Sequence, residues 1–136
     1  MFGSKTILIA DASTYAAIDL ADTVEACQGR VAGPVDTLAE ALAILDSDDV
    51  AGAIVDCELD DAAALVLRLA ERGVPLVMLT STPLPPALDA LERRLPVLMR
   101  PVAVRTLVHR LSIEMDRSAR ASAEAPAPGP VLRLPD

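Results

Sequence analysis

Four side chains that can hold or transfer charge each come directly after an apolar run of the chain. They are Asp11, Asp56, Thr80 and Arg100. Two carboxylates together can hold a divalent cation such as Mg²⁺, which keeps most of its waters when bound. A hydroxyl can donate a hydrogen bond to a phosphoryl oxygen, and a guanidinium can compensate the charge of that group. The set therefore indicates phosphoryl chemistry, provided that the fold brings the four side chains together.

The run before Asp56 predicts the strand around which the chain is organised. Residues 50–55 are uncharged and mostly apolar, which is typical of a strand buried on both faces of a parallel sheet. In open α/β sheets, ligands bind beyond the carboxyl ends of the strands. We therefore predict that Asp56 belongs to such a site. A helix or turn cap is the alternative role for a carboxylate in this position.

Apolar strands and amphipathic helices alternate five times along the chain. The predicted strands are 6–10, 30–35, 50–56, 74–79 and 96–99, and the apolar stripes of the five predicted helices begin at Ala17, Leu38, Leu65, Ala87 and Val104. Gly33-Pro34 restricts the second strand to an edge of the sheet. Thr37 and Glu40 have the spacing of a capping box before the second helix. The alternation predicts an α/β fold, with a doubly wound, five-stranded parallel sheet covered on both faces.

The composition limits the classes of function. The 136 residues are 52% hydrophobic but include one Tyr, one Phe and no Trp, so the core must be aliphatic. A net charge of −8 without a long basic run argues against nucleic-acid binding. We predict one folded domain over residues 1–117, followed by an Ala/Pro-rich tail over residues 118–136.

Cysteine usage and hydropathy predict the location. Cys27 and Cys57 are isolated and fit no metal or redox spacing, which favours a reducing compartment. No run approaches the roughly 20 apolar residues that span a bilayer, and no signal-like segment opens the chain. We therefore expect a soluble, cytoplasmic protein without membrane contact.

The segments that carry the four polar positions resemble those of receiver domains of two-component response regulators. They are Ile7–Asp11, Ala53–Asp56, Val77–Ser81 and Leu98–Pro101, in the order and at about the separations of that family. The resemblance covers about residues 5–116. It implies a flavodoxin-like fold with strand order 2-1-3-4-5. It also implies a cis peptide bond between Arg100 and Pro101.

The resemblance further implies a role for each site residue. Asp56 would accept a phosphoryl group from a histidine kinase or phosphotransfer protein, and Thr80 would be the switch hydroxyl. Mg²⁺ would be held by Asp11, Asp56 and the backbone carbonyl of Glu58. Arg100 would compensate the phosphoryl charge.

Two departures from the family pattern change this expectation. Ala10 stands where receivers usually have a second acid, and Arg100 stands where they usually have lysine. A guanidinium is wider and planar, so this replacement is not conservative. We therefore predict weak Mg²⁺ binding, slow phosphorylation of Asp56, and pairing of Arg100 with Asp56 in the unphosphorylated protein.

Three functions are compatible with these residues. The first is a single-domain receiver in a phosphorelay, which is not an enzyme and acts through protein–protein contacts. The target of this receiver would bind the face formed by the fourth helix, fifth strand and fifth helix, and the sequence is also compatible with a homodimer.

The second function is that of a phosphorylation-independent adaptor on the same fold. The third is a small phosphatase of the haloacid-dehalogenase type, because Asp56-Cys57-Glu58 and Leu79-Thr80 loosely imitate that family's first two motifs. However, no acidic pair follows Thr80 at a strand end.

Overall fold

The chain forms one parallel sheet. The computed structural model describes residues 1–81 and 95–124. Its strands are β1 (Thr6–Ala10), β2 (Arg30–Val35), β3 (Val50–Asp56), β4 (Leu76–Thr80) and β5 (Val97–Met99). All neighbours pair in parallel, in the order β2-β1-β3-β4-β5. The predicted sheet and its flavodoxin-like strand order are confirmed, and the Gly-Pro-containing strand β2 lies at an edge.

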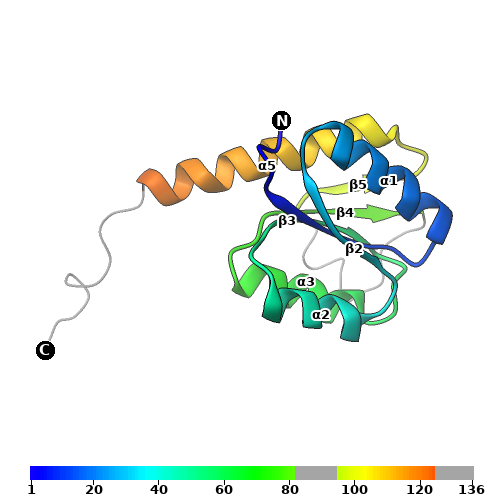
Figure 1. Cartoon of the computed structure of the whole chain (residues 1–136). Coiled ribbons are helices and arrows are strands. Elements are labelled where there is room, and N and C mark those ends of the chain that lie inside the picture. Colours follow the sequence, from blue (N-terminus) through cyan, green and yellow to red (C-terminus); the bar gives the residue numbers. More distant parts are fainter. Residues whose placement is uncertain (82–94, 125–136) are drawn as a thin grey trace, which may run out of the picture.

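Four helices of the described residues cover the two faces of this sheet. They are α1 (Thr14–Ala26), α2 (Leu38–Ser47), α3 (Ala62–Glu71) and α5 (Val104–Glu124). In Figure 1, α1 and α5 lie over one face, and α2 and α3 lie over the other. The predicted fourth helix falls mostly within residues 82–94, which lie outside the described residues.

The starts of α1 and α2 follow the capping signals in the sequence. The Ser13 hydroxyl accepts a hydrogen bond from the Ala16 N–H at 3.4 Å at the start of α1. At the start of α2, the Thr37 hydroxyl accepts from the Glu40 N–H and donates to the Glu40 carboxylate, both at 3.1 Å. These contacts satisfy N–H groups that a helix start otherwise leaves unpaired. The predicted capping pair of α2 is confirmed.

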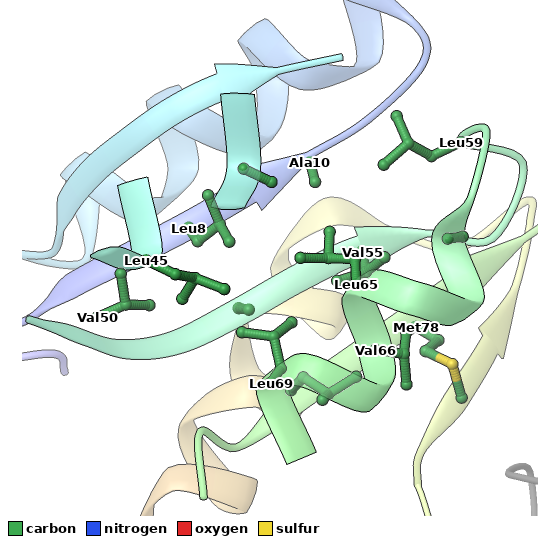
Figure 2. Close-up of a cluster of buried hydrophobic side chains, with 14 of the residues drawn as sticks. Leu8, Ala10, Leu45, Val50, Val55, Leu59, Leu65, Val66, Leu69 and Met78 are labelled. Atoms are coloured by element: carbon green, nitrogen blue, oxygen red, sulfur yellow. The ribbon is translucent and has the colours of Figure 1, made fainter. Parts of the chain in front are cut away.

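The core is aliphatic and has two layers because successive strand residues face opposite sides of the sheet. Leu8 and Val55 point toward α2 and α3, where they pack with Leu65 and Leu69 (Figure 2). Ile7, Ile9 and Ile54 face the other way and pack with Leu20 of α1 and Leu107 and Leu111 of α5. Each fully buried side chain of this size contributes about 1.5–3 kcal/mol. The two layers fix the sheet between its helices and so fix the strand ends.

The last helix is longer than its apolar stripe predicts. Met115 is the last buried residue within residues 104–121 of α5, and a Cβ atom added at Gly52 would lie 2.8 Å from its sulfur. Gly52 therefore allows α5 to approach β3 closely. Beyond Met115 the helix continues past the predicted boundary at residue 117, because its Ala, Arg and Glu residues favour helix. This end of α5 projects past the sheet in Figure 1. Residues 125–136 of the predicted tail lie outside the described residues.

Within the described part of the chain, no helix combines the length and apolar character needed to cross a membrane.

Candidate functional site

Buried polar side chains gather at the carboxyl edge of the sheet. Among the described residues, the buried polar or charged ones are Asp11, Asp56 and Thr80, each no more than 3% exposed. Asp11 follows β1, Asp56 ends β3 and Thr80 ends β4, and these three strands are neighbours in the sheet. The fold therefore brings together three of the four side chains singled out in the sequence. A buried polar group requires a partner, since leaving it unpaired is costly.

Arg100 supplies the positive charge at this edge. Its Nη2 lies 3.4 Å from Asp11 Oδ2, and its Nη1 lies 3.5 Å from Asp56 Oδ1. Its backbone N–H donates to the Thr80 carbonyl at 2.7 Å, which ties the residue to the end of β4. The Arg100-Pro101 peptide bond is cis, as predicted. One guanidinium thus contacts both carboxylates, although at distances longer than those of strong charge-assisted hydrogen bonds.

Backbone N–H groups orient both carboxylates. Asp11 Oδ1 accepts from the Ser13 N–H at 2.8 Å. Asp56 Oδ1 accepts from the Glu58 N–H at 2.9 Å, and Asp56 Oδ2 accepts from the Ala12 N–H at 3.1 Å. The Ala12 contact joins the loop after β1 to the end of β3. Both oxygens of Asp56 are therefore held by the main chain before any ligand binds.

Two further polar groups reach the guanidinium, and the sequence analysis did not assign them this role. The Ser81 hydroxyl accepts from Arg100 Nη1 at 3.1 Å. The Glu58 carboxylate accepts from the Ser81 N–H at 3.0 Å and lies 3.9 Å from the same Nη1. For Glu58, the family resemblance implies a role of the backbone carbonyl only. Both residues stand one or two positions after a strand end, which is the signal that could have found them.

Burial is the largest cause of the pKa shifts of Asp11 and Cys57. It raises the pKa of Asp11 from its ordinary value of 3.8 to about 6. The hydrogen bond from the Ser13 N–H opposes that rise, the charge of Asp56 adds to it, and Arg100 lowers the pKa. Burial also raises the pKa of Cys57 to about 11, with the charge of Asp56 as the next cause. Cys57 therefore remains a neutral thiol at neutral pH, in keeping with a small buried side chain.

The donor set fits a magnesium ion that retains most of its waters. Asp11 and Asp56 place two buried carboxylates at one edge of the sheet, and the Glu58 carbonyl belongs to the loop that follows Asp56. Mg²⁺ needs no more than one or two carboxylates. No cluster of three or more acidic, histidine or cysteine side chains suited to a metal occurs in residues 1–81 and 95–124. Because Arg100 contacts both carboxylates, a metal ion would have to compete with its guanidinium.

An apolar surface adjoins this charged cluster. A cavity of about 450 Å³ lies between α1 and α5, and its lining residues include Leu20, Leu107, Arg100 and Pro101. On α1, Tyr15 is 88% exposed and Ile18 is 51% exposed.

The fold and the strand-end residues define the class: the chain has the fold of a response-regulator receiver domain. It is similar to a CheY-like receiver domain from Methanospirillum hungatei, with 21% identity and a TM-score of 0.75, covering 85% of this chain and 97% of that one. It is also similar to the receiver domain of a modulated diguanylate cyclase from Desulfovibrio desulfuricans, with 25% identity and a TM-score of 0.75, covering 85% and 96%.

A third similar structure contains ligands. It is a response regulator from Burkholderia pseudomallei with a phosphorylated aspartic acid, a calcium ion and citrate. Its identity to this chain is 21% and the TM-score is 0.69, and the match covers 90% of this chain and 76% of that one. No family model and no curated protein sequence matches the chain.

Proposed function

We propose that this protein is a receiver module of a phosphorelay, with Asp56 as a slowly reacting phosphoacceptor. The observation that carries the proposal is the meeting of Asp11, Asp56 and Arg100 beside Thr80 at the carboxyl edge of a receiver fold. The phosphorylated aspartic acid and calcium ion in the similar Burkholderia pseudomallei structure support the same chemistry.

The proposed reaction moves one phosphoryl group. An Asp56 carboxylate oxygen attacks the phosphorus of a phosphohistidine or a small acyl phosphate. A new O–P bond forms, the bond from phosphorus to the donor breaks, and the donor leaves with the electron pair. Mg²⁺, when bound by Asp11, Asp56 and the Glu58 carbonyl, would offset the charge of the carboxylates and of the incoming group. The Ala12 and Glu58 N–H groups hold the attacking carboxylate in place.

Arg100 has two opposing effects in this proposal. Its charge favours the phosphorylated product by compensating the added negative charge. In the unphosphorylated protein, however, the same guanidinium already contacts Asp11 and Asp56 and competes with a metal ion. The loss of an upstream acid at Ala10 removes a further metal ligand. We therefore expect slow, metal-dependent phosphorylation and a small difference between the two states.

Signalling would proceed through protein contacts and not through catalysis of a substrate reaction. A histidine kinase or phosphotransfer protein would approach the charged edge, where Tyr15 and Ile18 are exposed. A downstream target would bind the face formed by the predicted fourth helix, β5 and α5, of which the described part includes Met99, 58% exposed on β5. A homodimer and a cytoplasmic location stay predictions, the latter supported by the free thiols of Cys27 and Cys57.

The direct test is phosphorylation by acetyl phosphate. Wild type and Asp56→Asn are incubated with acetyl phosphate and Mg²⁺ and followed by intact mass. We expect wild type to gain the mass of one phosphoryl group slowly, only with Mg²⁺, and Asp56→Asn to gain none. Absence of any labelling, or equal labelling of Asp56→Asn, would contradict the proposal.

A second candidate function is the phosphorylation-independent adaptor. The contact between Arg100 and Asp56 favours it, because a cation already placed at the phosphoacceptor imitates part of the phosphorylated state. An unlabelled wild type, with Asp56→Asn still binding its partner, would support this alternative. The phosphatase alternative is not favoured, since within the described residues 95–124 no acidic pair stands at a strand end.

A further inference from the structure

The shortest side-chain contact of the Arg100 guanidinium is with Ser81 and not with an acidic residue. Of the side-chain contacts of Nη1, the shortest is the 3.1 Å hydrogen bond to the Ser81 hydroxyl, and Asp56 Oδ1 follows at 3.5 Å. The Glu58 carboxylate lies 3.9 Å from the same nitrogen. Ser81 and Glu58 therefore contribute to the position of the guanidinium as much as the two aspartates do.

Ser81 and Glu58 are also joined to each other. The Ser81 N–H donates to Glu58 Oε2 at 3.0 Å, which links the loop after β3 to the end of β4. Both residues are exposed, whereas Asp11 and Asp56 are buried. The linked pair therefore contacts the guanidinium from the solvent side of the cluster, and the aspartates contact it from the core side.

The chemistry of this arrangement requires arginine. A guanidinium carries five N–H donors in a fixed plane, so Nη1 and Nη2 can serve different acceptors at the same time. Here Nη2 is directed to Asp11, and Nη1 is directed to Asp56 and Ser81. A lysine ammonium, as a compact point charge, would not hold this spread of acceptors in one geometry.

We propose that the Glu58 carboxylate and the Ser81 hydroxyl are positioning residues that hold the Arg100 guanidinium across Asp11 and Asp56 and so slow the reaction of Asp56. The inference rests on the proposed function, because it concerns the rate at which the same carboxylate reacts. Without the two positioning groups, the guanidinium leaves the aspartates more readily. Asp56 is then more often accessible to a phosphodonor and to a metal ion.

The first experiment measures the guanidinium itself. Rotation of the Arg100 Nη groups is followed by ¹⁵N NMR in wild type, Ser81→Ala and Glu58→Gln. Glu71→Gln is the matched control, since Glu71 forms a 3.8 Å ion pair with Arg68 within α3. We expect rotation to be about threefold or more faster in Ser81→Ala and Glu58→Gln, and unchanged in the control. Unchanged rotation in both site variants would overturn the inference without bearing on phosphorylation.

The second experiment measures the reaction. The Asp56 oxygen attacks the phosphorus of acetyl phosphate, the new O–P bond forms and acetate leaves with the electron pair of the broken bond. We expect Ser81→Ala and Glu58→Gln to label about three to ten times faster than wild type, and Glu71→Gln to label at the wild-type rate. In an Arg100→Gln background both accelerations should vanish. An acceleration that persists there would mean that Glu58 acts by repelling the donor, which would overturn the positioning role.

The two experiments separate the two claims. If no variant is labelled at Asp56, the proposed function fails, and the NMR result still decides the positioning role. If wild type is labelled but the two site variants label at the same rate as wild type, the proposed function stands and the inference fails.

Discussion

Two clusters of arginine and acidic side chains in this molecule have opposite composition. In the edge cluster, at the carboxyl edge of the sheet, Arg100 lies between the buried acids Asp11 and Asp56. In the α5 cluster, Glu114 lies between Arg110 and Arg117. The α5 contacts are shorter, 2.8 and 3.3 Å against 3.4 and 3.5 Å. Distance alone would make the α5 cluster the stronger of the two.

Burial and chain separation reverse that ranking. The α5 contacts are between residues three and four positions apart on one helix, with the Glu114 side chain 16% exposed and the arginine side chains 38% and 66% exposed. Pairs of this kind contribute little because water screens them. The edge cluster joins residues 44 and 89 positions apart and includes two buried carboxylates. Removing the partner of a buried charge is therefore the larger perturbation.

The largest expected effect comes from removing the shared arginine. Arg100→Gln leaves two buried carboxylates without their cation, so we expect a loss of about 3–5 kcal/mol in the free energy of unfolding at pH 7. Arg117→Gln on α5 should cost less than about 0.5 kcal/mol. Urea denaturation of both variants measures the difference. Similar losses would show that burial does not distinguish the clusters.

Removing Asp11, one of the two buried acids, should raise the free energy of unfolding at pH 7 instead of lowering it. The pKa of Asp11 is about 6 in the folded protein and 3.8 ordinarily, so the folded state binds more protons between these values. Stability from this group is thus fully present below about pH 4 and is lost as the pH rises through 6. Asp11→Asn should therefore stabilise the protein at pH 7 by up to about 3 kcal/mol and have little effect below pH 4.

The free energy of unfolding of wild type and Asp11→Asn is measured by denaturation at pH 7 and at pH 3.5. The measurement at pH 3.5 is the control, because the two proteins should then have nearly equal stability. A variant that is less stable than wild type at pH 7 would mean that the ion pair with Arg100 outweighs the burial of the Asp11 charge.

On α5, removing the shared acid should matter far less. Glu114→Gln removes both ion pairs of that cluster at once. We expect a loss of about 0.5–1 kcal/mol in urea denaturation, decreasing in high salt because exposed pairs are screened. A loss as large as that of Arg100→Gln would show that the two clusters contribute equally to stability.

These two clusters also differ in how far the sequence predicts them. Arg110 and Glu114 are four residues apart on a predicted helix, so their contact follows from helix geometry. The meeting of Asp11, Asp56, Thr80 and Arg100 follows from their places at the ends of apolar strands in a parallel sheet. The link from Glu58 to Ser81 does not follow, because it depends on the conformations of two loops 23 residues apart in sequence. The helical extension to Glu124 was missed since its Ala- and Ser-rich composition is also typical of a tail.

The smallest expected effect concerns that extension. Met115 is the last buried residue within residues 104–121 of α5, and Ala119, Arg120 and Ala121 are exposed. Deleting residues 119–136 should therefore change the melting temperature by less than about 2 °C. A calorimetric scan measures it, and a drop of several degrees would show that this end of the chain stabilises the domain.

Arg100 acts as the built-in cation of Asp11 and Asp56. Mg²⁺ titration of wild type and Arg100→Gln, followed by NMR through the amides of Ala12, Ser13 and Glu58, tests this role. These amides donate to the two carboxylates and report on them. We predict that Arg100→Gln binds Mg²⁺ at least about tenfold more tightly than wild type, because the ion no longer competes with a guanidinium. Equal or weaker binding by Arg100→Gln would contradict the account.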